Sequence, residues 1–251
     1  MKTECPTTNE TIVPLSDEKA TLEIVSKALL GLWETVNNLT RLRPTKRDRY
    51  RVTIFGSARV DPSHWVYGAV RDVAAELTRL GCDIVTGGGP GLMQAANEGA
   101  KLADPDGTYQ KSIGIRVELP FEQDVNAFVS DAFEHKTFFT RLHHFVLVSD
   151  AFIVCPGGIG TVLETLMVWQ LLQVRHLHDT PLILAGHFWD GLLDWAKGQM
   201  LKPDIPLINP ADLKIPQVLS DGPSIVQAVR EHHAQWNRKQ AQAGGTHERN
   251  Q

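Results

Sequence analysis

The chain has 251 residues, 42% of them hydrophobic and 22% charged, and its 25 basic and 29 acidic side chains give a net charge of −4. These are the values of an ordinary globular protein, and they exclude a collagen-like, largely disordered or histone-like chain. The length predicts one or two domains. Cys5, Cys82 and Cys155 are an odd number without Cys-x-x-Cys spacing, which argues against a disulfide framework and a cysteine zinc cluster.

The first residues of the chain lack the apolar segment of a secretory signal. The longest unbroken strongly apolar run is Ala151–Cys155, which is far too short to cross a membrane. We therefore expect a cytoplasmic protein with no membrane partner. Residues 1–16 are polar, and we expect them to be flexible.

Residues 17–49 are predicted to form an amphipathic helix followed by a basic connector. Apolar side chains recur at helical spacing between residues 17 and 39: Leu22, Val25, Leu29, Leu32, Trp33 and Val36. Their face needs a partner surface, either on the main domain or on a second chain. The segment Arg41–Arg51 carries six basic residues. We interpret it as a solvated linker, because the net charge is acidic, and keep nucleic-acid contact as the less favoured alternative.

Residues 50–240 alternate between short apolar strands and helices. Strands are predicted from Tyr50 and at Cys82–Thr86, Ser112–Leu119, Ala151–Cys155 and Pro181–Ala185. Helices are predicted between and after these strands. They lie at His64–Leu80, from the loop after Thr86 through Ala100, at Phe138–Val148, from the loop after Cys155 to about Gln173, at Phe188–Met200 and at Ser224–Lys239. This alternation predicts an α/β domain with an open parallel sheet and helices on both faces. Residues 241–251 are expected to form a disordered tail.

Two glycine-rich loops follow predicted strands and open predicted helices. The first is TGGGPGLM, from Thr86 to Met93, and the second is PGGIGT, from Pro156 to Thr161. Glycines at the carboxyl end of a strand let backbone N–H groups approach an anion, and the following helix adds its partial positive charge. The pair predicts a site for a phosphate and its attached sugar, although tight turns alone would also explain glycines. Neither loop has the phosphate-loop pattern of nucleoside triphosphatases.

Two charged residues lie near the second loop along the chain. Thr161-x-x-Glu164 has the spacing of a capping box, which explains Glu164 without catalysis. A carboxylate on the first turn beside an anion-binding loop would also lie where a sugar carbon could develop positive charge. Arg141, fifteen residues before Pro156, would approach the same crevice if its helix packs against that strand.

The segments GGGPGLMQAANEGA and SDAFIVCPGGIGTVLE resemble the Lonely Guy (LOG) family, long mislabelled as lysine decarboxylases. The resemblance covers roughly residues 51–196 and includes the PGGxGTxxE signature. Members of this family are nucleoside 5′-monophosphate phosphoribohydrolases, some of which release cytokinins while others act on AMP. The resemblance implies a Rossmann-like homodimer. Hydrolysis of an N-glycosidic bond needs no metal, and we expect no cofactor.

The resemblance also implies roles for individual residues of this chain. It implies catalysis and binding by Glu164 and Arg141, and phosphate binding by the second loop, at Gly157, Gly158, Gly160 and Thr161. From the glycine pattern we expect Gly88, Gly89 and Gly91 of the first loop to take part in substrate binding. Met93 is expected either to contact the nucleotide or to lie in the core. The resemblance supports a role in substrate binding for Gly56 and Ser57, after the first strand. Leu142 and Leu163 stand where plant-type members have Lys and Glu, and the first loop is one residue shorter. These departures point towards the bacterial nucleotide-processing branches.

The sequence therefore predicts hydrolysis of the N-glycosidic bond of a nucleoside 5′-monophosphate, of the AMP or cytokinin riboside type, to a free base and ribose 5-phosphate. The alternatives are a non-catalytic nucleotide-binding or molybdenum-cofactor carrier and a DNA-processing protein. Glu164 favours the enzyme, because a carrier needs the loops but not the carboxylate. We expect no metal, because the paired histidines at 143–144, 176 and 178, and 232–233 lack carboxylate support. No lysine adjoins either loop, which argues against pyridoxal-dependent decarboxylation.

Overall fold

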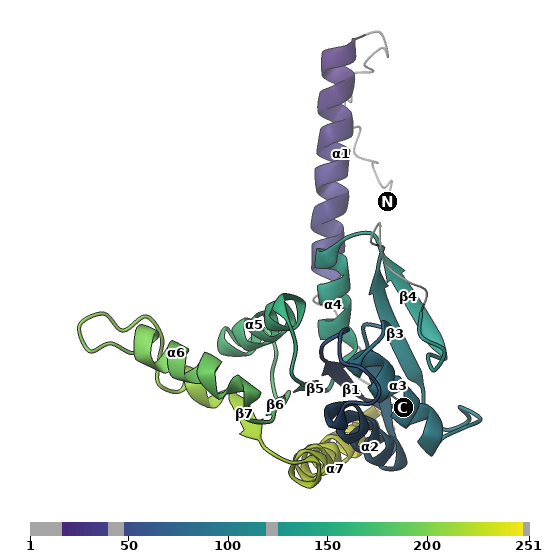
Figure 1. Ribbon diagram of the computed structural model, residues 1–251. Helices are drawn as coiled ribbons and strands as arrows, with labels where there is room; N and C mark the ends of the chain where they lie inside the picture. Colours follow the sequence, from purple (N-terminus) through teal and green to yellow (C-terminus); the bar gives the residue numbers. More distant parts are fainter. Residues whose placement is uncertain (1–16, 40–47, 119–124, 248–251) are drawn as a thin grey trace. The chain divides into compact units, whose positions relative to one another are not determined.

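The computed structural model describes residues 17–39, 48–118 and 125–247 (Figure 1), so the predicted flexible segment 1–16 lies outside the described residues. Two units are distinguished, Met1–Thr45 and Lys46–Gln251. In the first unit, the described residues 17–39 form the helix α1 (Glu18–Leu39), as their apolar spacing predicted. Leu22, Val25 and Leu29 on this helix are exposed. No helix of the described segments combines the length and the apolar character needed to span a membrane.

The described part of the second unit is built on a parallel sheet of seven strands in the order β4-β3-β2-β1-β5-β6-β7. In chain order the strands are β1 (Tyr50–Phe55), β2 (Cys82–Thr86), β3 (Ser112–Val117), β4 (Asp131–His135), β5 (Ala151–Val154), β6 (Leu182–Ala185) and β7 (Pro216–Leu219). Five of them were predicted. The open parallel α/β fold is thereby confirmed.

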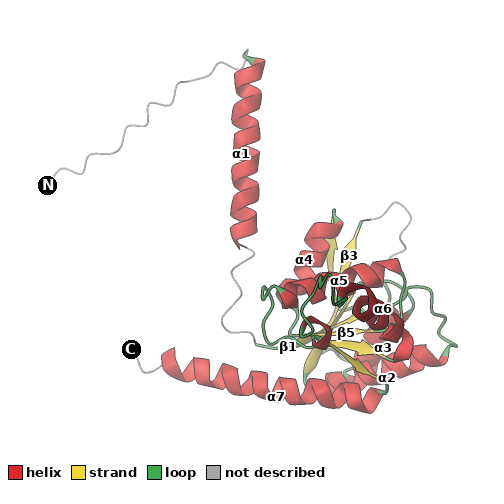
Figure 2. Ribbon diagram, turned by 90° about the vertical axis from the view of Figure 1, so that its left-hand side faces the viewer, coloured by secondary structure: helices red, strands yellow, loops and turns green. Residues whose placement is uncertain are grey.

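Helices cover both faces of this sheet (Figures 1 and 2). Those of the second unit are α2 (Trp65–Arg79), α3 (Leu92–Ala103), α4 (Phe138–Val148), α5 (Ile159–Gln173), α6 (Asp190–Met200) and α7 (Gly222–His247), with short 3-10 helices at His187–Trp189 and Asp212–Lys214. One apolar core lies between the sheet and α2, α3 and α7. A second core lies on the opposite face, where Phe145 of α4, Val168 of α5 and Trp189 are buried.

The two strands that the sequence did not predict, β4 and β7, lie at the edges of the sheet. In β4, Ala132, Phe133 and Glu134 are exposed, so this segment lacks the apolar run that marks a buried strand. The strand β7 has four residues and begins with Pro216, which forms no N–H bond to the sheet. Edge strands of this kind carry little periodic signal.

The helices at the end of the chain differ from the prediction in their extent. The segment predicted as one helix at 188–200 is a 3-10 turn followed by α6. The helix α7 continues to His247, beyond Lys239, so the expectation of disorder is wrong for residues 241–247, and 248–251 lie outside the described residues.

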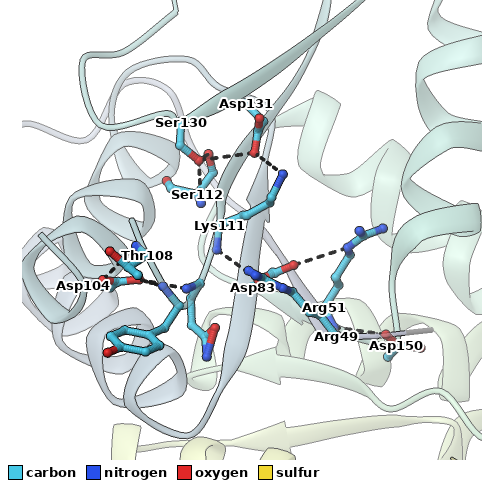
Figure 3. Close-up of polar contacts among 12 residues, drawn as sticks. Arg49, Arg51, Asp83, Asp104, Thr108, Lys111, Ser112, Ser130, Asp131 and Asp150 are labelled. Atoms are coloured by element: carbon cyan, nitrogen blue, oxygen red, sulfur yellow. Dashed lines mark hydrogen bonds and ion pairs between the residues drawn. The ribbon is translucent and has the colours of Figure 1, made fainter. Parts of the chain in front are cut away.

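Charged side chains join the amino ends of the central strands (Figure 3). The fully buried Asp83, at the start of β2, accepts the Lys111 backbone N–H at 2.9 Å. It also lies 3.4 Å from Arg49 Nη1 and 3.5 Å from Arg51 Nε. The Arg51 backbone N–H donates to Asp150 at 3.0 Å. These contacts fix the start of β1 against β2 and β5, at the edge of the sheet opposite the glycine-rich loops.

Candidate functional site

The strand order reverses direction at β1, which pairs with β2 on one side and β5 on the other. In open parallel sheets, ligands bind at the carboxyl ends of the strands at such a reversal. The three loops that leave β1, β2 and β5 are joined there. The Ser57 N–H donates to the Pro156 carbonyl at 3.1 Å, and the Leu92 N–H donates to the Ser57 carbonyl at 2.8 Å. Both glycine-rich loops are therefore held at one point.

Gly56 and Ser57 hold these loops together. A Cβ on Gly56 would lie 2.9 Å from the Leu92 Cβ, so a glycine lets β1 end close to α3. The Ser57 amide and carbonyl are both used in contacts between loops, and its hydroxyl accepts the Arg59 N–H at 3.1 Å. Gly56 and Ser57 thus lie where the loops after β1, β2 and β5 meet, and the hydrogen bonds of Ser57 are with the protein's own backbone.

The first glycine-rich loop is fixed by internal hydrogen bonds. Gly88 has φ +73°, and its N–H donates to the Thr86 hydroxyl at 2.9 Å. The Asn126 side chain donates to the carbonyls of Gly88 and Gly89 at 3.1 and 3.0 Å. Gly91 has φ +68°, and a Cβ there would come within 2.4 Å of the Ser57 carbonyl oxygen. The shape of this loop therefore depends on glycine at two positions and on a side chain 35 or more residues away.

Two asparagine side chains, the buried Asn97 and the partly buried Asn126, support this loop. The Thr86 hydroxyl donates to Asn97 Oδ1 at 2.7 Å, and Asn97 Nδ2 donates to the Ser112 hydroxyl at 2.9 Å. Asn126 also donates to Asn97 Oδ1, at 3.0 Å. The sequence analysis missed Asn97 and Asn126. The sequence could have pointed to Asn97, because it lies among the apolar residues of a predicted helix and a buried amide requires hydrogen-bond partners.

The second loop leads directly into α5, whose N-cap is Gly158. No side chain caps this end, and the space beside Gly158 and Gly160 is open. The capping box predicted for Thr161 and Glu164 is therefore wrong, because the helix begins before Thr161. The buried Thr161 side chain instead lies against Gly157, where any Cβ would overlap it. The first turn of α5 has the free N–H groups and the helix dipole that favour an anion.

Arg141 of α4 and Glu164 of α5 form a nearly buried ion pair. Arg141 Nη1 lies 3.1 Å from Glu164 Oε1, and the two side chains are 13% and 11% exposed. Arg141 Nε donates to the Ile115 carbonyl of β3 at 2.9 Å, and its guanidinium lies over the Phe145 ring. The structure thus brings together the two residues proposed from the sequence and fixes the arginine from two further sides.

Burial raises the pKa of Glu164 to about 7, although the neighbouring Arg141 charge and hydrogen bond act in the opposite direction. A carboxyl group whose pKa lies near neutrality can exist in either protonation state under physiological conditions. Perturbed carboxyl groups in crevices are frequent at functional sites. Glu164 can therefore stabilise a positive charge as the anion, or exchange a proton.

Gly87 lies where the arginine meets the first loop. A Cβ on Gly87 would be 2.5 Å from Arg141 Nη2 and 2.6 Å from Met93 Sδ. Met93 is partly buried and also lies beside Gly89. Met93 therefore contacts the loop rather than the deep core. Gly87, which the sequence analysis did not select, is the position that admits both side chains.

The histidines near Arg141 pack within the fold. His135 Nε2 and His144 Nδ1 are 2.9 Å apart, and burial, with smaller contributions from His135, Arg51 and His143, lowers the pKa of His144 to about 4. Burial also lowers the pKa of His143. In the ranges that the structure covers, no three or more His, Cys, Asp or Glu side chains form a group suited to a metal ion. The expectation of a reaction without metal or cofactor stays a prediction.

Comparisons with known proteins bear on the same part of the chain. A family model described as "Possible lysine decarboxylase" matches residues 93–229, which is more than half of the chain. A pyrimidine/purine nucleotide 5′-monophosphate nucleosidase of Escherichia coli K12 is 29% identical over 140 residues, which are 54% of this chain and 30% of that protein. A cytokinin riboside 5′-monophosphate phosphoribohydrolase of Mycobacterium tuberculosis is 45% identical over 53 residues, 20% of this chain and 27% of that protein. The chain thus spans about 30% of the length of these relatives.

Solved structures share the fold at low sequence identity. A molybdenum cofactor binding protein of Rippkaea orientalis has a TM-score of 0.55 at 19% identity, covering 74% of this chain and 98% of that one. The molybdenum cofactor carrier protein of Chlamydomonas reinhardtii has a TM-score of 0.54 at 18% identity, covering 74% and 99%. At these identities the likeness concerns the fold alone. The match to more than half of the chain places it in a family: this protein belongs to the Lonely Guy (LOG) family, whose model carries the description of a possible lysine decarboxylase.

Proposed function

We propose that the protein hydrolyses the N-glycosidic bond of a nucleoside 5′-monophosphate, of the AMP or cytokinin riboside type, and releases the free base and ribose 5-phosphate. The observation that carries this proposal is the Arg141–Glu164 pair beside the uncapped start of α5. The names of the two curated relatives support the same class of reaction. A carrier would need the loops, but it would not need a buried carboxyl group with a raised pKa.

Each part of the site has a place in this reaction. The first turn of α5, at Gly158 and Gly160, binds the 5′-phosphate through backbone N–H groups. Cleavage of the bond to the base leaves an oxocarbenium-like sugar. The Glu164 carboxylate either stabilises this cation or takes a proton from the water that attacks it. Arg141 holds Glu164 in place and offers its remaining N–H groups to ribose or phosphate oxygens.

A substrate panel tests this function directly. The purified protein is incubated with AMP, GMP, CMP, UMP and isopentenyladenosine monophosphate, and free bases are separated by chromatography. We expect release of a base from at least one of them. Stoichiometric binding of a nucleotide without any base release would instead favour the carrier, and salt-dependent retention of DNA without base release would favour the DNA-processing alternative.

The raised pKa of Glu164 predicts an unusual pH dependence. If the carboxylate is the active form, kcat/KM should rise with pH, reach half of its maximum near pH 7 and level off above it, whereas with an ordinary glutamate the half-maximum would fall near pH 4.5. The stability should move in the opposite direction: because the pKa is raised by folding, the contribution of Glu164 is full below about pH 4.5 and is lost as the pH rises through 7. A pH profile that is flat between 5 and 8 would contradict the active-carboxylate role.

Replacement of Gly87 by alanine should lower activity without unfolding the protein. The added methyl group meets the ends of two side chains, Arg141 and Met93, and not the backbone, so the domain should still fold. Its unfolding temperature should fall, because the nearly buried Arg141 is pushed from its ion pair. Arg141 would then leave the position from which it holds Glu164, so we expect kcat to fall roughly tenfold or more, because small misplacements at a reacting centre are costly. Gly68→Ala, at a helix position with open space around it, is the matched control for both activity and thermal unfolding.

We propose further that the protein is a homodimer that uses α5. Trp169, Leu171 and Leu172 of α5 pack on the protein's own core. Ile159, Leu163 and Leu166 of α5 are exposed and recur at helical spacing, and Val174, the residue after the helix, is exposed as well. Phe138 and Phe139, at the start of α4, are also exposed. An apolar surface of this kind favours association.

Light scattering at micromolar concentration tests the dimer. We expect about twice the 27.9 kDa mass of one chain, and a shift towards one chain for Leu166→Glu, since an interfacial charge would be buried. Leu102→Glu, at an exposed leucine of α3, should leave the mass unchanged. Full activity at the mass of a single chain would refute the dimer as part of the site, because the partner is expected to close the crevice and exclude water.

A further inference from the structure

A cleft lies between α2 and the start of α7, on the face of the sheet opposite to the one that carries Arg141 and Glu164. We call it the α2–α7 cleft, and its volume is about 480 Å³. Its floor is formed by Ile54 of β1, Ile153 of β5 and Cys155, and its walls by Val70 and Ile225. Pro156, the first residue of the second glycine-rich loop, lies on its wall, but Arg141, Glu164 and the glycines of both loops do not line it. This volume lies in the range of small-molecule sites in proteins.

The cleft is deep and apolar. Ile54 and Ile153 are each 1% exposed, so they belong to the apolar core beneath the cleft. Burial raises the pKa of the Cys155 thiol to about 12, so this residue presents a neutral group. At the opening, Trp65 and Phe188 are exposed aromatic side chains that come from different elements. A narrow apolar floor between two aromatic rings suits a compact apolar molecule.

Two polar side chains at the opening, Asp221 and His187, have partners within the protein. Asp221 accepts the Ser224 N–H at 2.8 Å and the Ser224 hydroxyl at 2.9 Å. His187 Nδ1 lies 3.0 Å from Asp190 Oδ2. A nucleobase or a charged ligand would therefore bury donors and acceptors without partners, which is costly. This argues against the cleft being the base subsite of the proposed reaction.

We infer that the α2–α7 cleft is a second ligand site, separate from the Arg141–Glu164 site, for a neutral, apolar small molecule of aromatic or alicyclic character. Burial of apolar surface supplies the affinity, at roughly 25 cal/mol per Å². Val70 and Ile225 set the width of the site, and the rings of Trp65 and Phe188 cover the bound molecule. This inference does not depend on the proposed reaction.

The neutral fluorescent probe N-phenyl-1-naphthylamine tests the site in the full-length protein. We expect saturable binding of one probe per chain at micromolar concentration. Ala69, an exposed residue of α2 that lines the cleft, is the position to fill. Ala69→Phe should weaken binding at least tenfold, about 1.4 kcal/mol. Ala234→Phe, at an exposed alanine of α7 outside the cleft, should change the affinity for the probe by no more than about twofold, since substitutions on the surface usually have small effects.

Several results would overturn the inference. Equal probe binding by both variants would place the probe elsewhere, and absence of saturable binding to the wild type would show that the cleft takes no such ligand. Displacement of the probe by AMP would make the cleft part of the nucleotide site. A change in the mass of the assembly caused by Ala69→Phe alone would identify the cleft as a contact between copies of the chain. Thermal unfolding of each variant verifies that it is folded.

Discussion

Replacement of Glu164 by glutamine is expected to lower kcat by at least ~100-fold while the fold survives. The loss follows from removing the charge, or the proton acceptor, next to the developing sugar cation, an effect typically of about 10²–10⁴-fold. The fold should survive because burial already favours the neutral form of this side chain. Glutamine keeps an oxygen that can accept the Arg141 Nη1–H now found at 3.1 Å.

The stability of this variant separates a catalytic role from a structural one. Glu164→Gln should unfold within a few degrees of the wild type, whereas Glu164→Ala should be clearly less stable, because it leaves the buried Arg141 charge without its partner. Near-wild-type turnover of Glu164→Gln would show that the carboxylate serves only to hold Arg141. A variant that binds AMP with unchanged affinity but does not cleave it would place Glu164 in the chemical step.

Adenosine is expected to be hydrolysed at least ~100-fold less efficiently than AMP, as judged by kcat/KM. The reason lies at the start of α5, where no side chain caps the helix and open space surrounds Gly158 and Gly160. A phosphate bound there would orient the ribose for attack, and binding energy from such a remote group is used to lower the barrier. Comparable turnover of the nucleoside and the nucleotide would contradict this prediction.

Inhibition by products checks the same site without relying on turnover of the poorer substrate. Ribose 5-phosphate should compete with AMP at concentrations at which ribose has no effect. A bulky residue at Gly160 should weaken inhibition by ribose 5-phosphate and leave the fold intact, since a side chain there would meet open space. If ribose and its phosphate inhibit equally, the uncapped turn is not the phosphate site.

The parts of the fold that the sequence predicted are those with a strong local pattern. Short apolar runs predicted the five central strands, and glycine-rich segments located the loops at their carboxyl ends. The helix Phe138–Val148 was predicted with the ends that the structure gives it. The edge strands β4 and β7 were missed because they have too few buried residues to produce a periodic signal.

The candidate site, too, has parts that a local sequence pattern predicts and parts that depend on the folded chain. Loop positions and the two charged residues could be named from motifs, but their contacts depend on tertiary structure. The pairing of Arg141 with Glu164 spans 23 residues, and no local rule predicts it. Local spacing was misleading at Thr161, where the capping box pattern occurs inside a helix that begins earlier. Asn126 acts on a loop 37 residues before it in the chain, which only the folded sheet brings within reach.

The buried Asp83 also bears on the long-range electrostatics of the basic connector. Six cations occur between Arg41 and Arg51, but Arg49 and Arg51 act as counter-charges to this carboxylate. Only four would then remain to displace counterions from a polyanion. Because each phosphate contact changes the logarithm of the binding constant by about 0.9 per decade of salt, this segment would give a slope no steeper than roughly −4. The connector therefore has much less capacity for ion release than its composition suggests.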